Sequence, residues 1–193
     1  QLGVAVHLYH QDVGYLPRPP RNLSNWQRDP NTLLSIMAHL YPYYGNTDMW
    51  QKSVQACNTG SRPWNDPPHT YQSTVVKLLL CPTDTRLLAP LTDIEGRTGA
   101  FGSYLPCRGG KRQTNGFFGK DGHRAVGKLA MMHDGLSHTI MLGERPPPDS
   151  LQAGRWYPSQ TPHSDAWGDF PTGPDNSMAT FNPLYGGDNC DGV

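Results

Sequence analysis

The sequence is poor in charge and has no long apolar run. No segment reaches the roughly 20 apolar residues that a membrane-spanning helix needs, and the N-terminus lacks the charged, apolar and small-residue regions of a signal peptide. Only 17% of the residues are charged, and 16 basic residues balance 16 acidic ones. A dedicated nucleic-acid-binding domain needs an excess of positive charge, so we expect no nucleic-acid partner.

The four cysteines include no CxxC pair, nor any other close pair of the kind that binds zinc or exchanges disulfides. Their wide spacing favours structural disulfides, which implies an oxidising compartment, whereas buried free thiols in a cytosolic protein are the alternative. Three connectivities are open. We favour Cys81 with Cys107, because each lies beside a proline at the edge of an apolar segment, which leaves Cys57 with Cys190.

Glycine and proline are abundant, since 21 Gly and 19 Pro make up more than a fifth of the 193 residues. They are dispersed among Trp, Tyr and Leu, a pattern that predicts an ordered domain with long irregular loops. The length suits one domain over residues 1–193. We find no internal repeat of fixed period.

Two segments near the N-terminus are predicted to be helical. In the first, apolar residues recur every three or four positions, at Leu2, Ala5, Val6, Tyr9 and Val13. Leu8 is expected to widen this buried face, Gly14 to end the helix and Pro17 to prevent a restart. A second, shorter helix is predicted within 31–45, where six apolar positions precede a proline and a glycine.

The rest of the chain is predicted to consist of loops and short strands. Residues 18–30 and 46–71 have the composition of irregular connectors. The clearest strand pattern is STVVKLLLCP, residues 73–82, a short apolar run closed by Pro82. Further strands are expected within the ranges 99–107, 115–119 and 137–144, with a weaker one at 153–159.

These elements predict an α+β fold in which an antiparallel sheet packs on one long helix. We expect residues 1–14 to form the helix, 15–71 a helix and loop insertion, 72–157 the sheet, and 158–193 an irregular C-terminal region.

Four segments, in order, resemble the DUF1559 family of exported planctomycete proteins, also called SBP_bac_10. QLGVAVHLYHQDVGYLP at 1–17 is similar to the stretch after the family's prepilin-type membrane helix, and LLLCPTD at 78–84 to its strand ending in Cys-Pro-Ser/Thr-Asp. HDGLSHTIMLGERPP at 133–147 resembles the family's signature, with His138 in place of the usual Asn. NPLYGGDNCDGV at 182–193 resembles the segment before the family's terminal strands.

This resemblance implies a type IV pilin-like fold, with a long N-terminal helix laid across a small antiparallel sheet, presented outside the cytoplasmic membrane. The expected location is therefore extracellular, at the cell surface or periplasmic. Family members begin with a leader and an apolar half-helix that this sequence does not contain. A membrane contact is accordingly expected only through a segment outside this sequence.

Catalytic patterns are weak, and we expect the protein not to be an enzyme. His7 and His10 are three residues apart but have no third ligand nearby in sequence, which favours polar positions of a helix over a metal site. Ser137, His138 and Asp134 lack the scaffold of a hydrolase triad. A turn, with positive φ at Gly135, is the better interpretation of this motif, ahead of a ligand-binding role.

The segment GGDNCDGV is the best candidate for an ion site. Asp188, Asn189 and Asp191 supply hard oxygen ligands among glycines, which suits Ca²⁺, although their spacing is not that of an EF-hand. Some pseudopilins hold calcium in a loop near the C-terminus, as the resemblance would imply. The alternative is an Asx-turn held by Cys190.

Aromatic and basic residues in the loops are the candidates for ligand contact. Stacking on sugar rings is one role for the tryptophans, and phosphate or acidic glycan binding is one for the basic stretch around Phe117 and Phe118. Loop anchoring and a solvated hairpin are the alternatives. The candidates are Trp50, Trp64, Trp156, Trp167, Arg108, Lys111 and Arg112.

Two functions follow from these patterns. The first is a structural, pilin-like or pseudopilin-like subunit of an extracellular filament or of an assembly related to type II secretion, which associates with itself or with similar subunits. The second is an extracellular module that binds a polysaccharide or another solute. The aromatic and basic loops support the second, and the four matching segments support the first.

Overall fold

The computed structural model describes residues 1–17, 30–45, 47–93, 96–107, 117–118, 128–132, 135–149, 151 and 154–158. The helices are α1 (Leu2–Val13), α2 (Pro30–Leu33), α3 (Ile36–Tyr44) and α4 (Thr47–Asn58). The strands are β1 (Leu91–Thr92), β2 (Thr98–Gly99), β3 (Tyr104–Pro106) and β4 (Leu142–Glu144). The mixture of helices and small antiparallel sheets confirms the α+β class.

Helix α1 confirms the first sequence prediction. Its buried residues Leu2, Ala5, Val6 and Tyr9 form the expected face. Gly14 ends the helix at a φ of 82°, a conformation that glycine adopts without steric cost, and its N–H donates to the carbonyl oxygen of His10 at 2.9 Å. The prediction for Leu8 was wrong, because its side chain is 42% exposed on the opposite face.

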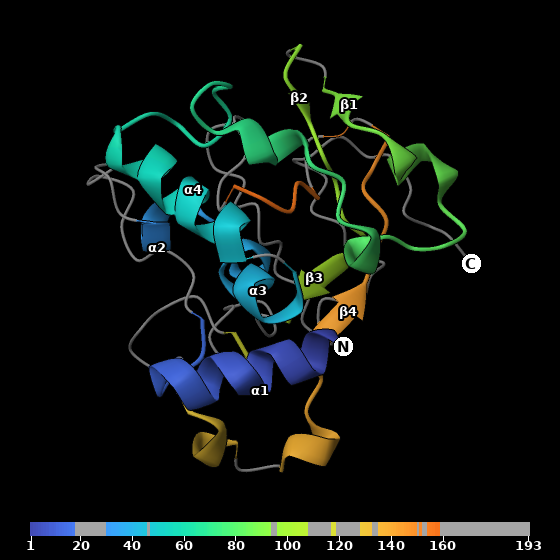
Figure 1. The fold of residues 1–193 in the computed structure, drawn as a ribbon. Helices are drawn as coiled ribbons and strands as arrows, with labels where there is room; N and C mark the ends of the chain where they lie inside the picture. The colour runs from blue at the N-terminus through green and yellow to red at the C-terminus, as the bar shows by residue number, and fades with distance from the viewer. Residues whose placement is uncertain are drawn as a thin grey trace.

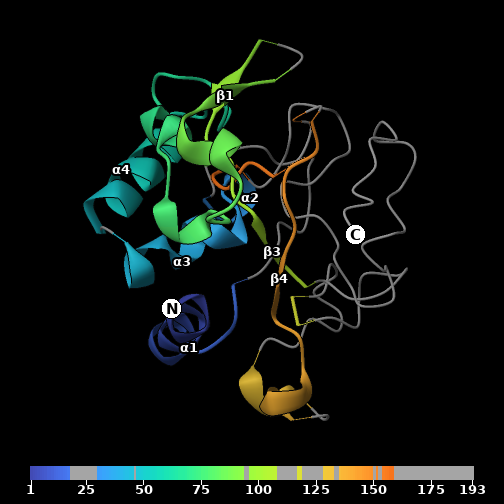
Figure 2. The ribbon, with the colours of Figure 1, turned by 90° about the vertical axis from the view of Figure 1, so that its right-hand side faces the viewer.

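Helix α1 packs mainly on another helix, whereas the sequence predicted packing on a sheet. Its buried face meets α3 through Ile36 and Leu40, and Phe117 and Phe118 close the same cluster. Leu142 of β4 is at the edge of this cluster. Figures 1 and 2 show α1 beside α3, with the β3–β4 pair alongside the helices.

The single helix predicted within 31–45 is two helices, α2 and α3, separated at Ser35. The Ser35 hydroxyl accepts from the N–H of Ala38 at 3.1 Å, which caps α3, and donates to the carbonyl oxygen of Trp156. The Ser35 N–H donates to the carbonyl oxygen of Tyr157 at 3.0 Å. Because the hydroxyl and the N–H of Ser35 bind the 156–157 segment, the helix restarts at this residue.

The prediction of a long loop over 46–71 was wrong for its first half, which forms α4. Met49, Ser53, Ala56 and Cys57 are buried along one face of this helix. The helix crosses α3 and covers the core on the side away from α1 (Figure 1).

The strand predicted over 73–82 was also wrong. A 3-10 turn covers Lys77–Leu79, where the N–H of Leu79 donates to the carbonyl oxygen of Val76 and that of Leu80 to Lys77. The segment therefore turns inside the core, where Val76, Leu79 and Leu80 are buried.

The strands form two antiparallel pairs, β1–β2 and β3–β4. In the second pair Tyr104 faces Glu144 and Pro106 faces Leu142. β3 lies within the predicted 99–107 segment, and β4 forms the last three residues of the predicted 137–144 segment. All four strands lie within 72–157, the region that we expected to form the sheet. β1 was not predicted.

The two remaining predicted strands do not form as such in the described residues. Phe117 and Phe118 are buried in a turn, and the 154–158 segment makes only isolated bridges, from Arg155 to Phe101 and from Pro158 to Leu34. Of the predicted irregular connector at 18–30, Pro30 is the first residue of α2, and the rest lies outside the described residues, as does the region after Pro158.

The main core cluster lies between α2, α3, α4 and the 154–158 segment. Leu34, Met37, Cys57, Leu79 and Tyr157 are among its most buried members. Tyr44 and Leu142 contact both this cluster and the cluster beneath α1, so the two are continuous.

Candidate functional site

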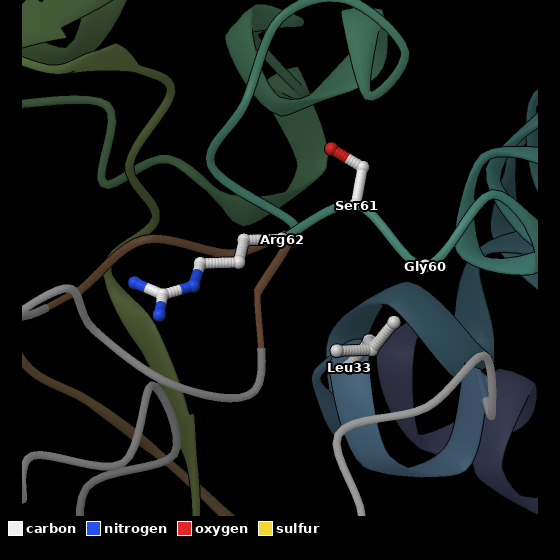
Figure 3. Close-up of a pocket in the computed structure, with 4 residues that line it drawn as sticks. All are labelled: Leu33, Gly60, Ser61 and Arg62. Atoms are coloured by element: carbon white, nitrogen blue, oxygen red, sulfur yellow. The ribbon is translucent and has the colours of Figure 1, made fainter.

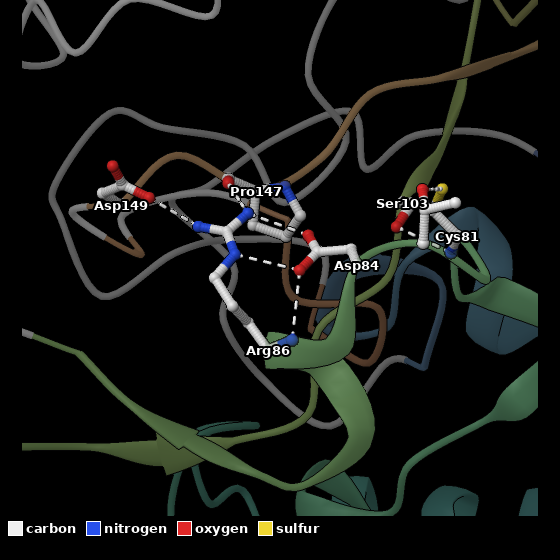
Figure 4. A network of polar contacts seen from close by, with 7 residues as sticks. Cys81, Asp84, Arg86, Ser103, Pro147 and Asp149 are labelled. Carbon is white, nitrogen blue, oxygen red and sulfur yellow. Dashed lines mark hydrogen bonds and ion pairs between the residues drawn. The ribbon is translucent and has the colours of Figure 1, made fainter.

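Two segments that carry the family resemblance meet at Ser103, beside the start of β3 (Figure 4). The Ser103 hydroxyl accepts from the N–H of Cys81 at 3.0 Å, and its N–H donates to the carbonyl oxygen of Leu79 at 2.7 Å. The Ser103 carbonyl oxygen accepts from the N–H of Arg145. Ser103 is fully buried and so joins the 78–84 and 133–147 segments.

Arg86 makes a second link between these segments. Its guanidinium contacts both carboxylate oxygens of Asp84, at 2.9 and 2.8 Å, and also Asp149 Oδ1 at 2.5 Å and the carbonyl oxygen of Pro147 at 3.2 Å. The hydrogen bonds from Arg86 lower the pKa of Asp84. The Arg86 side chain is 43% exposed, so the pair adds about 0–1 kcal/mol. This junction positions backbone segments, and its charged groups already satisfy one another.

A second cluster gathers two guanidinium groups around Trp64. The guanidinium carbon of Arg62 lies 5.6 Å from the centre of the indole ring, and that of Arg97 lies 5.9 Å from it. Both distances are within the range of a cation–π interaction. Trp64 is half-buried and Arg62 is exposed, so the cluster is open to solvent.

A cavity of about 230 Å³ adjoins this cluster (Figure 3). It is lined by Leu33, Gly60, Ser61 and Arg62. In Figure 3 the Arg62 side chain extends away from Leu33, on the other side of the 60–62 turn. Arg62 thus belongs both to the cavity and to the aromatic cluster.

The side chain of His69, which is fully buried, contacts the 60–62 turn that lines the cavity. His69 Nε2 lies 3.1 Å from the carbonyl oxygen of Ser61, and Nδ1 lies 2.9 Å from the hydroxyl oxygen of Tyr157. Burial lowers the pKa of His69 and raises that of Tyr157, because each charged form would lose solvent. The neutral pair fixes the position of Ser61.

Arg97 is held by a buried ion pair on the β1–β2 hairpin. Asp93 Oδ1 accepts from the N–H of Arg97 at 2.9 Å, and Asp93 Oδ2 accepts from Arg155 Nη2 at 3.1 Å. Arg155 Nη2 also donates to the carbonyl oxygen of Arg97 at 2.6 Å. The side chains of Asp93 and Arg155 are only 1% and 2% exposed. The backbone that carries Arg97 is therefore fixed.

The predicted ligand residues do not form one site. Trp64 lies in the cluster above, whereas Trp50 on α4 is half-buried against the ring of His39, at 5.1 Å between centroids. The prediction of ligand contact was wrong for Trp156, which is 3% exposed and donates from Nε1 to the carbonyl oxygen of Thr74 at 2.9 Å. The other predicted ligand residues, Trp167, Arg108, Lys111 and Arg112, lie outside the described residues.

Sequence reasoning did not single out Arg62 or Arg97. The sequence Arg-Pro-Trp at 62–64 was a local signal for the first, because residues two apart in a turn can meet. Arg97 comes from the β1–β2 hairpin, and no sequence pattern links it to Trp64.

The structure contains no disulfide between Cys81 and Cys107. The hydrogen bond from the Cys81 N–H to the Ser103 hydroxyl places Cys81 beside Ser103. Ser103 precedes Cys107 by four residues, and four extended residues span about 13 Å. A disulfide needs Cα atoms within about 7 Å. Cys57 is buried in the core, and its predicted partner Cys190 lies outside the described residues.

The described residues hold no group of three His, Cys, Asp or Glu side chains that would suit a metal ion. His7 is exposed on α1, and Nε2 of His10 accepts from the N–H of Leu129 at 3.3 Å. The predicted calcium ligands Asp188, Asn189 and Asp191 lie outside the described part of the chain.

The predicted turn at Gly135 is confirmed, with a φ of 82°. Asp134 lies outside the described residues, and Ser137 and His138 form a 3-10 turn after the glycine. None of the described helices combines the length and the apolarity that crossing a membrane requires.

Comparison with known proteins gives one match. The family model described as "Protein of unknown function (DUF1559)" matches residues 1–183, which confirms the resemblance to this family. The match covers the first three of the four sequence segments and ends just after the fourth begins. No curated protein and no solved structure matches the chain.

Proposed function

The chain belongs to the DUF1559 family, and we propose that it is a non-catalytic, pilin-like structural subunit that assembles outside the cytoplasmic membrane by packing α1 against α1 of another copy or of a similar subunit. The observation that carries the proposal is the outer face of α1. Val4 is 61% exposed, Leu8 is 42% exposed, and Tyr15 just beyond the helix is 41% exposed.

Val4 and Leu8 are four residues apart, so they share one side of the helix, away from the face that packs on α3. Tyr15 follows Gly14, which ends the helix. Gln11, seven residues after Val4 on the same side, is neutral. The only Asp, Glu, Lys or Arg of α1 is Asp12, which accepts a hydrogen bond from the Tyr43 hydroxyl at 2.7 Å.

A helix that packs only on the core of its own domain usually carries charged residues on the face that points to solvent. Helix α1 instead has apolar residues on two opposite faces, which suits a helix packed between its own domain and a neighbour. The N-terminal helix is also the element that pilin-like subunits are expected to use for assembly. The proposal extends to an exported location, since such assemblies form outside the cytoplasm.

A double variant, Val4→Lys with Leu8→Lys, tests this function. We expect it to weaken self-association by about tenfold to a hundredfold, because two partly exposed apolar side chains would no longer be buried in the contact. Sedimentation velocity over a range of protein concentrations measures the change. Leu88→Lys is the control, because Leu88 is an exposed apolar residue of the Thr85–Leu88 turn, outside α1, and is 68% exposed. A wild-type chain that stays monomeric at every concentration, or a control that disrupts association equally, would contradict the proposal.

A further inference from the structure

We propose that Tyr157 is a redox-active tyrosine, which gives one electron through Trp156 and Tyr41 to an oxidant at the surface and its phenolic proton to His69. This activity does not depend on the assembly surface on α1, because it uses other residues. The reaction partner is defined by its chemistry. It is a one-electron acceptor strong enough to oxidise a phenol, such as an oxygen-derived radical or a high-potential metal complex.

The first argument is a continuous row of oxidisable rings that leads from the surface to Tyr157. Tyrosine and tryptophan, together with the sulfur-containing residues, are the side chains that give up one electron most readily. Tyr41, which is partly exposed, stacks on Trp156 with 5.6 Å between the ring centroids and 29° between the ring planes. Trp156 in turn meets Tyr157 at 5.5 Å between centroids. These are the distances of rings in contact, so each electron-transfer step is short.

The second argument is the hydrogen-bond partner of Tyr157. A phenol that loses an electron becomes a very strong acid, so oxidation of a tyrosine requires a base that takes the phenolic proton. His69 Nδ1 lies 2.9 Å from the Tyr157 hydroxyl oxygen. The carbonyl oxygen of Ser61, 3.1 Å from Nε2, can only accept a hydrogen bond, so the ring hydrogen is on Nε2 and the lone pair of Nδ1 faces the phenol. The base is therefore in place before oxidation.

The third argument is that burial links the movement of the proton to that of the electron. Burial raises the pKa of Tyr157 and lowers that of His69, so both partners stay neutral while the phenol is reduced. Loss of an electron reverses this preference, because the oxidised phenol no longer retains its proton. The protonated imidazole then keeps both hydrogen bonds, since Nδ1–H donates to the phenoxyl oxygen and Nε2–H to the carbonyl oxygen of Ser61.

Atoms and electrons balance in this oxidation. The O–H bond of Tyr157 breaks and an N–H bond forms at His69 Nδ1, while the oxidant takes one electron from Tyr41, which is refilled from Tyr157 through Trp156. Tyr157 becomes a neutral phenoxyl radical, and the oxidant is reduced by one electron. The Tyr157 side chain is 1% exposed, so this radical is shielded from solutes and outlasts a radical on a surface tyrosine. Return of one electron and of the proton restores the phenol.

Tyr43 provides the matched comparison. Its ring contacts Tyr9 at 5.6 Å between centroids, and its hydroxyl donates to Asp12 at 2.7 Å. Tyr43 therefore also has a ring neighbour and a proton acceptor. It differs from Tyr157 because it is partly exposed and because its ring contact is with Tyr9 rather than with Trp156.

Photochemical oxidation of the full chain tests the proposal. The oxidant is tris(bipyridine)ruthenium(III), generated by light in the presence of persulfate, and electron paramagnetic resonance of samples frozen after increasing delays detects the radical. We expect the wild type to give a neutral tyrosyl radical that persists after the surface radicals have decayed, and Tyr157→Phe to lose this signal. His69→Gln should lose it as well, because the phenolic proton then has no base. Tyr41→Phe should lower the yield without changing the spectrum, because phenylalanine is much harder to oxidise.

Tyr43→Phe is the control and should leave the persistent signal unchanged. Melting temperatures check that each variant folds. The tyrosine variants keep the aromatic ring and hence most of the packing, so they decide the question if His69→Gln does not fold. A wild type without a persistent tyrosyl signal, a folded Tyr157→Phe variant that retains it, or a folded Tyr41→Phe variant with the wild-type yield would overturn the proposal. So would an equal loss of the signal in Tyr43→Phe.

Discussion

His69 joins three parts of the molecule through its two ring nitrogens. The carbonyl oxygen of Ser61 can only accept a hydrogen bond, so Nε2 carries the hydrogen and Nδ1 accepts from the Tyr157 hydroxyl. The bonds therefore require the neutral ring. A proton on Nδ1 would remove the acceptor that Tyr157 needs, in a place where the ring has no exposed surface.

We expect the free energy of unfolding to fall as the pH drops below about 6.5. Burial lowers the pKa of His69 from its usual value of 6.5, so below that value the unfolded chain binds a proton that the folded chain resists. The stability is complete above the unfolded pKa and is lost as the pH falls toward the folded one. Urea unfolding at about pH 7.5 and about pH 5 measures this.

His69→Gln should be less stable than the wild type at neutral pH and should depend less on pH over this range. His7→Gln is the control, because His7 is exposed on α1 and should leave the wild-type pH dependence in place. An unchanged pH dependence in His69→Gln would show that another group causes it.

Residue patterns located only part of the candidate site. Trp64 and Trp156 were both candidates for ligand contact because a tryptophan offers a broad apolar face for stacking, but Trp156 lies in the core. What distinguishes the two is tertiary. Trp156 stacks on Tyr41 at 5.6 Å between centroids, whereas Trp64 meets Arg62 and Arg97. The sequence spacing of these residues contains no information about those contacts.

At the scale of elements, Ser35 decides where α3 begins. Its hydroxyl caps the helix and also binds the carbonyl oxygen of Trp156, and the residue is 1% exposed. We expect Ser35→Ala to lower the free energy of unfolding by about 1–3 kcal/mol, since it removes a cap and leaves a buried carbonyl oxygen without this donor. Chemical denaturation measures the loss. Ser137→Ala, in an exposed turn, should change it by less than about 0.5 kcal/mol, and an equal effect of both variants would contradict this account.

The elements that sequence predicted correctly have one buried side. Helix α1 has a single buried face, so its apolar residues recur with the helical period. Helix α4 carries the same signal, at Met49, Ser53, Ala56 and Cys57, but two of these residues are small or polar and the surrounding Gly, Asn and Pro suggested a loop.

The error at 73–82 has a different cause. This segment is packed on more than one side, because Val75 and Leu78 are half-buried and Val76, Leu79 and Leu80 are buried. A continuous apolar run contains no period that separates a strand from a turn inside the core. Helix packing and the bonds from the chain around Ser103 decide the result, and neither is visible locally.

At the scale of the whole molecule, the 154–158 segment holds distant parts together. Trp156 and Tyr157 lie in the main core, and Tyr157 contacts His69 below the cavity. Arg155 bridges to Phe101, with its guanidinium carbon 5.1 Å from the ring centre. The segment therefore connects the helices to the β1–β2 hairpin, and the buried pair of Arg155 with Asp93 is the polar part of that connection.

We expect Asp93→Asn to lower the free energy of unfolding by about 3–5 kcal/mol, because it leaves the Arg155 guanidinium buried without its counter-charge. Burial already lowers the pKa of Arg155, and Asp93 is the neighbour that opposes this shift. The arginine has little room to move toward Gly99, where an added Cβ would lie 2.0 Å from Arg155 Nη1. Arg86→Gln is the control, because it removes an ion-pairing side chain that is 43% exposed. It should lower the free energy of unfolding by about 0–1 kcal/mol. Urea unfolding compares the two variants. If Asp93→Asn lowered the free energy of unfolding as little as the control does, Arg155 would have to reach solvent, and apolar contacts alone would hold the hairpin.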